Sequence, residues 1–108
     1  MTSNKQYLFN EAGDLVVPML YTLGYEAVTL REPKARDIKT MRRHAIAYTK
    51  QNAGAPIDDI TTLEIAITVL CTSHELTVKQ IDEWDAEDMM EVGSALSTFR
   101  VFKNYINA

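Results

Sequence analysis

The sequence predicts one α+β domain over residues 1–108, in which an N-terminal antiparallel β-hairpin or meander is followed by about four α-helices. Two observations support this fold class. The hydrophobic period changes from about 2 to about 3.6 within residues 25–37, so a strand passes into a helix there. After that point the chain contains a breaker and two helix-capping signatures, which divide residues 33–107 into separate helices. A chain of this length supports a single core.

The composition is that of an ordinary globular domain, because 46% of the residues are hydrophobic and 24% are charged. The net charge of −4 provides no overall positive field, which argues against nucleic acid as a partner. Residues 1–5 are polar and predict a frayed end. No apolar run approaches the ~20 residues that span a bilayer, and the start of the chain lacks the apolar core of a signal peptide. We therefore expect a cytosolic protein that does not bind membranes.

Residues 6–31 form the predicted β-hairpin region. Two apolar runs, at residues 7–9 and 15–23, are separated by turn-forming residues. Pro18 cannot donate a backbone hydrogen bond, so the second run should be an edge strand or should be interrupted near this proline. Residues 26–31 alternate between apolar and polar side chains, as a half-buried strand does.

Residues 34–51 predict the first helix, which starts directly after Pro33 because proline is tolerated at a helix start. The apolar residues that share one helical face are Ile38, Met41, Ala45 and Tyr48. Seven of the eleven Lys and Arg residues fall between residues 31 and 50. This concentration is either the solvated face of the helix or a patch for an acidic partner or nucleic acid, with Arg42 and Arg43 as contact residues.

Residues 57–73 predict a central helix, because apolar residues occur nearly all round it at helical spacing. A breaker at residues 52–56 separates it from the first helix. The β-branched residues within it are also compatible with a buried strand, so that alternative stays open for residues 65–71. An N-cap at Asp58 or Asp59 favours the helix.

Two capping signatures predict the starts of the remaining helices. Thr77 and Gln80 have the spacing of a capping box, and Leu76 and Ile81 have the spacing of a hydrophobic staple, so a short helix begins there. A similar arrangement recurs eight residues later, with capping acids and flanking apolar residues that are Asp85, Asp88, Trp84 and Met89.

The last helix is expected to run from Ala86 towards Tyr105. Its core face is predicted from one stripe at helical spacing, which comprises Met89, Val92, Leu96, Phe99, Phe102 and Ile106. Further large apolar residues lie off this stripe, so the helix carries more apolar surface than packing on one face requires. The candidate partner-binding residues on it are Met90, Val101, Phe102 and Tyr105.

The sequence contains no recognisable catalytic or metal-binding pattern. His44, Cys71 and His74 lack the spacing of a zinc site. We therefore expect no enzyme activity and no cofactor. A small DNA-binding regulator that uses the basic helix 34–51 is the alternative function that the residues leave open.

Two stretches, TLREPKARDI (29–38) and LTVKQIDEWDAEDMMEV (76–92), resemble the tail assembly chaperones of long-tailed bacteriophages, in particular the small E/41-type proteins of P2-like and Mu-like phages. In that family a strand ending in Leu-Arg-x-Pro precedes an Asp, and a Leu-Ser/Thr cap precedes a short helix and an Asp-containing start to the last helix. The matching signature residues are Leu30, Arg31, Pro33, Asp37, Leu76, Thr77, Gln80, Trp84, Asp85 and Asp88. Lys34 departs from the family, which often has Thr or Ser there, and this weakens the helix cap.

The resemblance implies a non-enzymatic protein that acts in the host cytoplasm during infection and is absent from the mature virion. Its expected client is the long, helical tape measure protein, which such chaperones keep soluble while tail tube subunits polymerise around it. The tail tube protein and a second copy of the chain are further candidate partners. Arg31 and Asp37 are expected to fix the hairpin against the helices rather than to contact a ligand.

Overall fold

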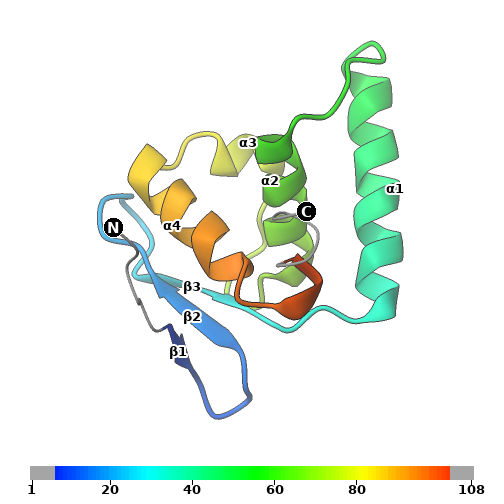
Figure 1. Ribbon diagram of the computed structural model, residues 1–108. Coiled ribbons are helices and arrows are strands. Elements are labelled where there is room, and N and C mark those ends of the chain that lie inside the picture. Colours follow the sequence, from blue (N-terminus) through cyan, green and yellow to red (C-terminus); the bar gives the residue numbers. More distant parts are fainter. Residues whose placement is uncertain (1–6, 103–108) are drawn as a thin grey trace, which may run out of the picture.

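A computed structural model describes residues 7–102 of the chain. The elements in this range are β1 (Leu8–Phe9), β2 (Leu15–Pro18), β3 (Ala27–Leu30), α1 (Ala35–Gln51), α2 (Asp59–Leu70), α3 (Val78–Ile81) and α4 (Ala86–Leu96). In Figure 1 the sheet lies at one side of the molecule, α4 and α2 occupy the centre, and α1 stands at the opposite side. The predicted α+β fold class is confirmed.

The three strands form an antiparallel sheet in the order β1-β2-β3, so β2 is the central strand. The expectation that the Pro18 strand lies at an edge is therefore wrong, but the alternative, an interruption at the proline, is confirmed because β2 ends at Pro18. β1 pairs only with Leu15 and Val16. Pro18 consequently has no β1 residue opposite it. Because proline has no N–H to donate, a position without a β1 partner costs the sheet no hydrogen bond.

The core forms where the inner face of the sheet meets α2 and α4. Leu15 and Val17 of β2 and Val28 and Leu30 of β3 are all fully buried, because alternate residues of a strand point to the same face. The helices contribute further core residues, which are Ala66, Ile67 and Leu70 of α2, Ile81 of α3, and Met89, Val92, Ala95 and Leu96 of α4. α4 faces α2 at Gly93, where a Cβ would lie 3.4 Å from Cδ1 of Leu63, about an ordinary contact distance.

Residues 59–70 form helix α2. The alternative of a buried strand at residues 65–71 is therefore wrong for residues 65–70. Asp58 is the N-cap, and its side chain accepts a hydrogen bond of 2.7 Å from the Thr61 N–H. Cys71 is extended and forms an isolated antiparallel bridge with Leu30. The end of α2 is thereby joined to the outer edge of β3.

Helix α1 is confirmed close to its predicted bounds, but it is buried less than its apolar face suggested. Met41 and Tyr48 of this face are half-buried, whereas Ile38 at its start is 39% exposed. The only residue of α1 that is fully enclosed is Asp37. A helix packed mainly against one neighbour, α2, leaves the outer part of an apolar stripe in solvent.

The predicted capping box of α3 is confirmed, because the Gln80 N–H donates to Thr77 Oγ1 (3.2 Å) and the Thr77 N–H donates to Gln80 Oε1 (2.9 Å). Asp85 caps α4 by accepting from the Glu87 N–H. The expectation of one helix from Ala86 towards Tyr105 is wrong, since α4 ends at Leu96 and helical backbone resumes only at position 100.

Two hydroxyl groups bond backbone carbonyls at this break in the helix. Ser97 Oγ donates to the carbonyl of Ser94 (2.6 Å), and Thr98 Oγ1 donates to the carbonyl of Ala95 (2.8 Å). Side chains that bond nearby carbonyls compete with the helical backbone. Backbone hydrogen bonds of the i to i+3 type then tighten the turn, including one from the Phe99 N–H to the Leu96 carbonyl.

Candidate partner-binding surface

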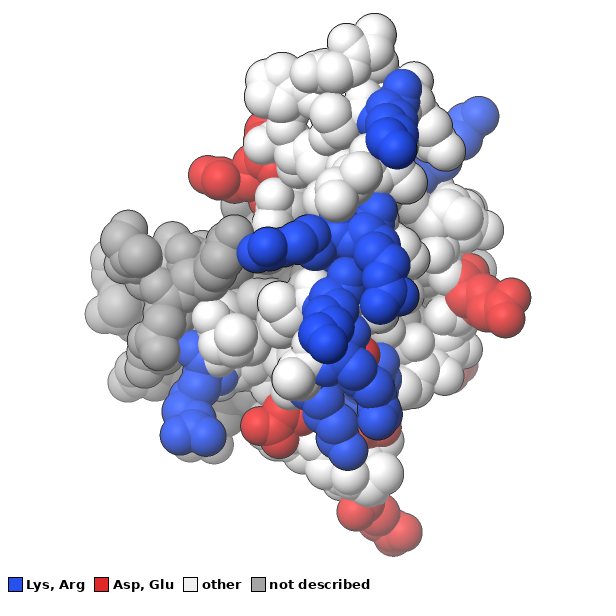
Figure 2. Space-filling model, turned by 90° about the vertical axis from the view of Figure 1, so that its right-hand side faces the viewer, with Lys and Arg blue, Asp and Glu red and all other residues white. Residues whose placement is uncertain are grey.

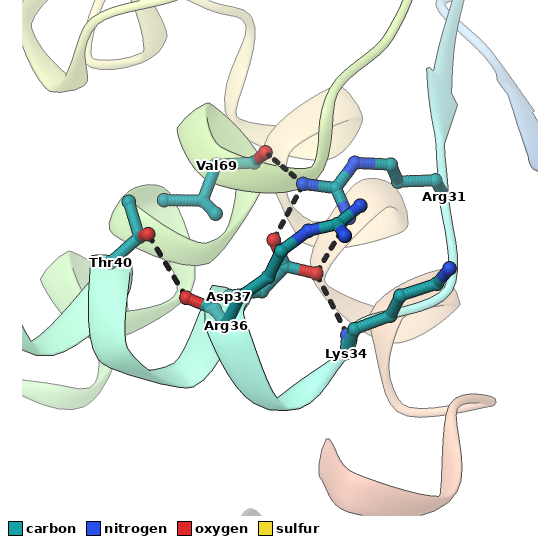
Figure 3. Close-up of polar contacts among 6 residues, drawn as sticks. All are labelled: Arg31, Lys34, Arg36, Asp37, Thr40 and Val69. Atoms are coloured by element: carbon teal, nitrogen blue, oxygen red, sulfur yellow. Dashed lines mark hydrogen bonds and ion pairs between the residues drawn. The ribbon is translucent and has the colours of Figure 1, made fainter.

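The strand-to-helix junction is held by an ion pair between the half-buried Arg31, just after β3, and the buried Asp37, in the first turn of α1 (Figure 3). Arg31 Nη1 and Nη2 donate to the two Asp37 oxygens at 2.5 and 2.6 Å, which is a bidentate geometry. The Lys34 N–H donates to Asp37 Oδ2 (2.7 Å). Arg31 Nη2 also reaches the Val69 carbonyl near the end of α2, at 3.4 Å.

These contacts give the Arg31 and Asp37 signature residues a structural role. The hydrogen bond from Arg31 lowers the pKa of Asp37 against the opposing effect of burial. One carboxylate thus joins β3 and the start of α1, and Arg31 extends the connection to α2. Asp37 also satisfies the backbone at the helix start, where the Lys34 side chain makes no capping hydrogen bond.

Asp88, the last signature residue, anchors the loop between β2 and β3. Its Oδ1 accepts from the Leu20 N–H (3.0 Å), and its Oδ2 accepts from the N–H groups of Tyr21 (3.0 Å) and Thr22 (2.7 Å). Thr22 Oγ1 donates to Oδ2 as well (2.7 Å) and accepts from the Asp85 N–H (3.0 Å). The prediction that Asp88 caps its own helix is therefore wrong. Its carboxylate binds the loop instead, and the N–H of the N-cap residue, Asp85, donates to Thr22.

The electrostatics of Asp88 agree with this anchoring role. Burial alone would raise its pKa, but the hydrogen bonds from Thr22, Tyr21 and Leu20 together hold the pKa below its usual value. The ionised form is therefore the one that the loop binds. A carboxylate with several charge-assisted hydrogen bonds fixes its donors strongly, so the loop backbone is held in one conformation.

The side chains carried by this anchored loop face solvent. Leu20 is 74% exposed, Tyr21 is 58% exposed and Leu23 is 94% exposed. We call these three residues the apolar loop. Large apolar side chains gathered on a fixed segment of a small domain are typical of a binding surface. Their exposure was not predicted, because they belong to the apolar run at residues 15–23, which predicts a strand at a sheet edge or one interrupted near Pro18. The large apolar residues between Pro18 and Gly24 are the sequence feature that could have indicated it.

The predicted contact residues of the last helical region are found in different environments. Met90 is 62% exposed and lines a shallow depression of about 330 Å³ on α4. Val101 is exposed at a second depression of about 340 Å³, which it shares with Pro33 and Phe99. Phe102 is only 7% exposed and packs in the core, which argues against it as a contact residue. Tyr105 lies outside the described residues.

The basic residues of α1 form one face of the molecule. Figure 2 shows Lys and Arg side chains following the helix, with few acidic atoms among them. The exposed members are Lys34, Arg36, Lys39, Arg42, Arg43 and Lys50. The charge of Arg36 helps to lower the pKa of Asp37. By contrast, no ion pair to Arg42 or Arg43 is found among residues 7–102. Both predicted basic contact residues are therefore accessible.

A pair of acidic side chains connects α2 to α3. Glu64 is buried, and desolvation together with a hydrogen bond and charge repulsion from Asp82 raises its pKa to about 8. The protonated form of Glu64 is therefore the main one at neutral pH. The described residues contain no group of three or more His, Cys, Asp or Glu side chains placed to hold a metal ion. Between residues 7 and 102, no helix is both long and apolar enough to cross a membrane.

Comparison with known proteins agrees with the two stretches that gave the resemblance. The model of the family described as "Phage tail assembly chaperone proteins, E, or 41 or 14" matches residues 23–100, a range that runs from the β2-β3 connection past the end of α4. Neither a search of curated proteins nor a search of solved structures finds a match to the chain. Because the family match covers most of the sequence, including both anchoring carboxylates, the chain belongs to the phage tail assembly chaperone family.

Proposed function

We propose that this chaperone binds the tape measure protein of its phage, keeps it soluble, and assists polymerisation of the tail tube around it. The membership of the chain in a tail assembly chaperone family supports this role. The protein acts without catalysis, in the cytoplasm of the infected host cell, and is not retained in the mature virion. The tail tube protein is a further candidate partner at the time of polymerisation.

The observation that carries the proposal is the apolar loop. Leu20, Tyr21 and Leu23 are exposed, yet the backbone beneath them is fixed by Asp88. A long helical client exposes apolar stripes until it is packed in the tail, and such stripes bind to apolar surfaces on a partner. A loop that is already ordered loses little conformational entropy on binding. Met90 and Val101 offer separate exposed apolar contacts to the same client.

Co-expression with the tape measure protein encoded in the same genome tests this proposal. We expect the soluble fraction of the client to rise with the wild-type chaperone and to fall when Leu20, Tyr21 and Leu23 are each replaced by Ser. The matched control is Leu8→Ser with Ile46→Ser, which removes exposed apolar side chains from β1 and α1. Single variants Met90→Ser and Val101→Ser test the two sites that the sequence predicted.

A client that is equally insoluble with and without the wild-type chaperone would refute the proposed function. If instead the client is solubilised by the apolar-loop variant as well as by the wild type, the function stands and the assignment of its surface to the apolar loop is wrong. Folding of each variant is checked by thermal unfolding, because the side chains replaced are solvent-exposed and should contribute little to stability.

The second candidate function is a small DNA-binding regulator, and the exposed basic face of α1 favours it. It predicts retention on heparin at moderate salt, lost in an Arg42→Gln, Arg43→Gln variant. The overall charge of −4 opposes such binding. Passage of the wild-type protein through heparin without retention would exclude this function.

A further inference from the structure

Exposed acidic side chains border the apolar loop. At the base of the loop the Met19 N–H donates to the carbonyl of the exposed Glu26 (2.9 Å). At the start of α4 the Asp85 N–H donates to Thr22, within the loop (3.0 Å), and the Glu87 N–H donates to Asp85 (2.9 Å). Asp85 and Glu87 are exposed as well, and Figure 1 shows the β2-β3 connection beside the start of α4. We call Glu26, Asp85 and Glu87 the acidic border.

The sheet and α4 carry acidic residues but no basic ones. Residues 7–30 and 80–99, which include every strand and all of α4, contain nine acidic residues and no Lys or Arg. Seven of the eleven basic residues fall between residues 31 and 50, mostly in α1, which stands at the opposite side of the molecule from the sheet (Figure 1). Within the described part of the chain, no hydrogen bond or ion pair to the side chains of Glu26 and Glu87 is found. Their charges are therefore available to a partner.

The same two stretches hold most of the exposed apolar surface. Of the ten large apolar residues that are exposed among residues 7–102, six lie in these stretches, and they are Leu8, Phe9, Leu20, Tyr21, Leu23 and Met90. Glu87 of the acidic border also lines the shallow depression around Met90. A surface that combines exposed apolar groups with acids favours a partner that has apolar groups and positive charge, because a negative partner would bring like charges together.

We propose that the apolar loop and the acidic border bind a segment of the client that forms an amphipathic helix with Lys or Arg beside its apolar stripe. This inference rests on the proposed function and specifies which part of the client is bound. Apolar contacts with the loop supply most of the affinity, and the charges select the segment and its orientation. Apolar stripes of the same client that are flanked by acids are bound less tightly.

Overlapping peptides that cover the tape measure protein of the same phage, probed with the purified chaperone, identify the segments that are bound. We expect the retained peptides to combine apolar residues at helical spacing with an excess of Lys and Arg. Their binding should weaken about fivefold or more between about 50 and about 500 mM salt, since salt screens contacts between exposed charges. Retained peptides without an excess of positive charge would overturn the inference.

A designed pair of peptides measures the same selectivity without the client. Both peptides have about 20 residues and the same leucine stripe, and their polar positions are Lys in one peptide and Glu in the other. We expect the chaperone to bind the Lys peptide about tenfold more tightly or better, measured by fluorescence anisotropy. The variant in which Leu20, Tyr21 and Leu23 are each replaced by Ser should lose this binding.

Two double variants of equal net charge separate the acidic border from the general charge of the protein. Glu26→Gln with Glu87→Gln should weaken binding of the Lys peptide about fivefold, because each exposed charge pair contributes a modest part of the affinity. The matched control, Glu11→Gln with Asp59→Asn, likewise removes one acid from a connection of the sheet and one from a first helical turn, and should bind as the wild type does. Asp85 is kept because it caps α4.

Three results with the designed peptides would overturn the inference. Equal affinity for the Lys and Glu peptides would show that apolar contact alone selects the partner. An equal loss in both double variants would show that net charge attracts the peptide without a specific border. Binding that survives in the apolar-loop variant would place the contact on another surface. In each case the proposed function stands if co-expression still raises the soluble fraction of the client, whereas a client that stays insoluble removes the function and the inference together.

Discussion

Replacement of Asp88 by Ala should be the most destabilising change at a polar residue of this fold. It removes the acceptor of four hydrogen bonds that join α4 to residues 20–22. A hydrogen bond to a charged group contributes roughly 1.5–3 kcal/mol, but the amides of Leu20 and Tyr21 lie near the surface and water can replace their acceptor. We therefore expect a loss of about 3 kcal/mol in the free energy of unfolding, from a total of about 5–15 kcal/mol for a domain of this size.

The related variant Asp88→Asn should cost less, about 1–2 kcal/mol. Asn keeps one carbonyl oxygen, which can occupy the position of Oδ2 and accept three of the four bonds. Its NH₂ group would then face the Leu20 N–H, where two donors repel each other. The expected order of stability is wild type, Asp88→Asn, Asp88→Ala.

Urea unfolding at pH 7 measures these differences, and hydrogen exchange of the amides of residues 20–22 locates them. Glu87→Gln is the matched control, because it also removes one negative charge from the first turn of α4 but from an exposed side chain. The stabilisation from Asp88 is present above the unfolded pKa of 3.8 and is lost as the pH falls through the lower folded value. The reasoning is refuted if Asp88→Ala costs no more than Glu87→Gln.

Three further predictions concern the Arg31–Asp37 ion pair, Glu64 and Phe102. Arg31→Gln leaves the Asp37 carboxylate without its bidentate partner and should lower the free energy of unfolding by about 2 kcal/mol. Adding Asp37→Asn should restore part of this loss. If urea unfolding shows no recovery in the double variant, the two residues do not form a specific pair. Glu64 has a folded pKa raised from 4.5 to about 8, so its stabilisation is complete below pH 4.5 and declines as the pH rises through about 8, by at most about 1.4 kcal/mol per pH unit. Glu64→Gln should flatten this decline in a series of thermal melts from pH 5 to 9, and an unchanged slope would show that another group titrates. Phe102→Ala should lower the free energy of unfolding by about 3 kcal/mol without selectively impairing client binding, and a stable variant that loses the client would restore Phe102 as a contact residue.

Much of the secondary structure was accessible from local sequence because its causes are local. The capping box of Thr77 and Gln80 operates within one turn, and the period change before Asp37 needs only neighbouring residues. The continuation of the last helix was predicted wrongly for a local reason as well. The apolar stripe continued beyond Leu96, but the backbone there forms a turn with i to i+3 hydrogen bonds, in which the hydroxyl groups of Ser97 and Thr98 bond nearby carbonyls.

The candidate site was less accessible, because exposure depends on which elements pack against each other. Phe102 and Val101 are neighbours in the sequence, yet the first is buried in the core and the second is exposed. Ile38 belongs to the apolar stripe of α1 but remains exposed because α1 packs mainly on one helix. No periodicity could reveal the apolar loop, since its exposure follows from how residues 20–23 turn away from the sheet.

The sequence alone determined the element types, most of their limits and the family signature, because capping, periodicity and proline act over a few residues. Only the tertiary structure decided what the signature carboxylates do. Asp37 bonds an arginine six residues earlier, across the strand-to-helix junction, while Asp88 bonds backbone groups 66 to 68 residues earlier. A carboxylate in a helix start looks the same in sequence whether it caps its own helix or fixes a distant loop. Its partner is chosen by the packing that excludes water around it and brings the donors within reach.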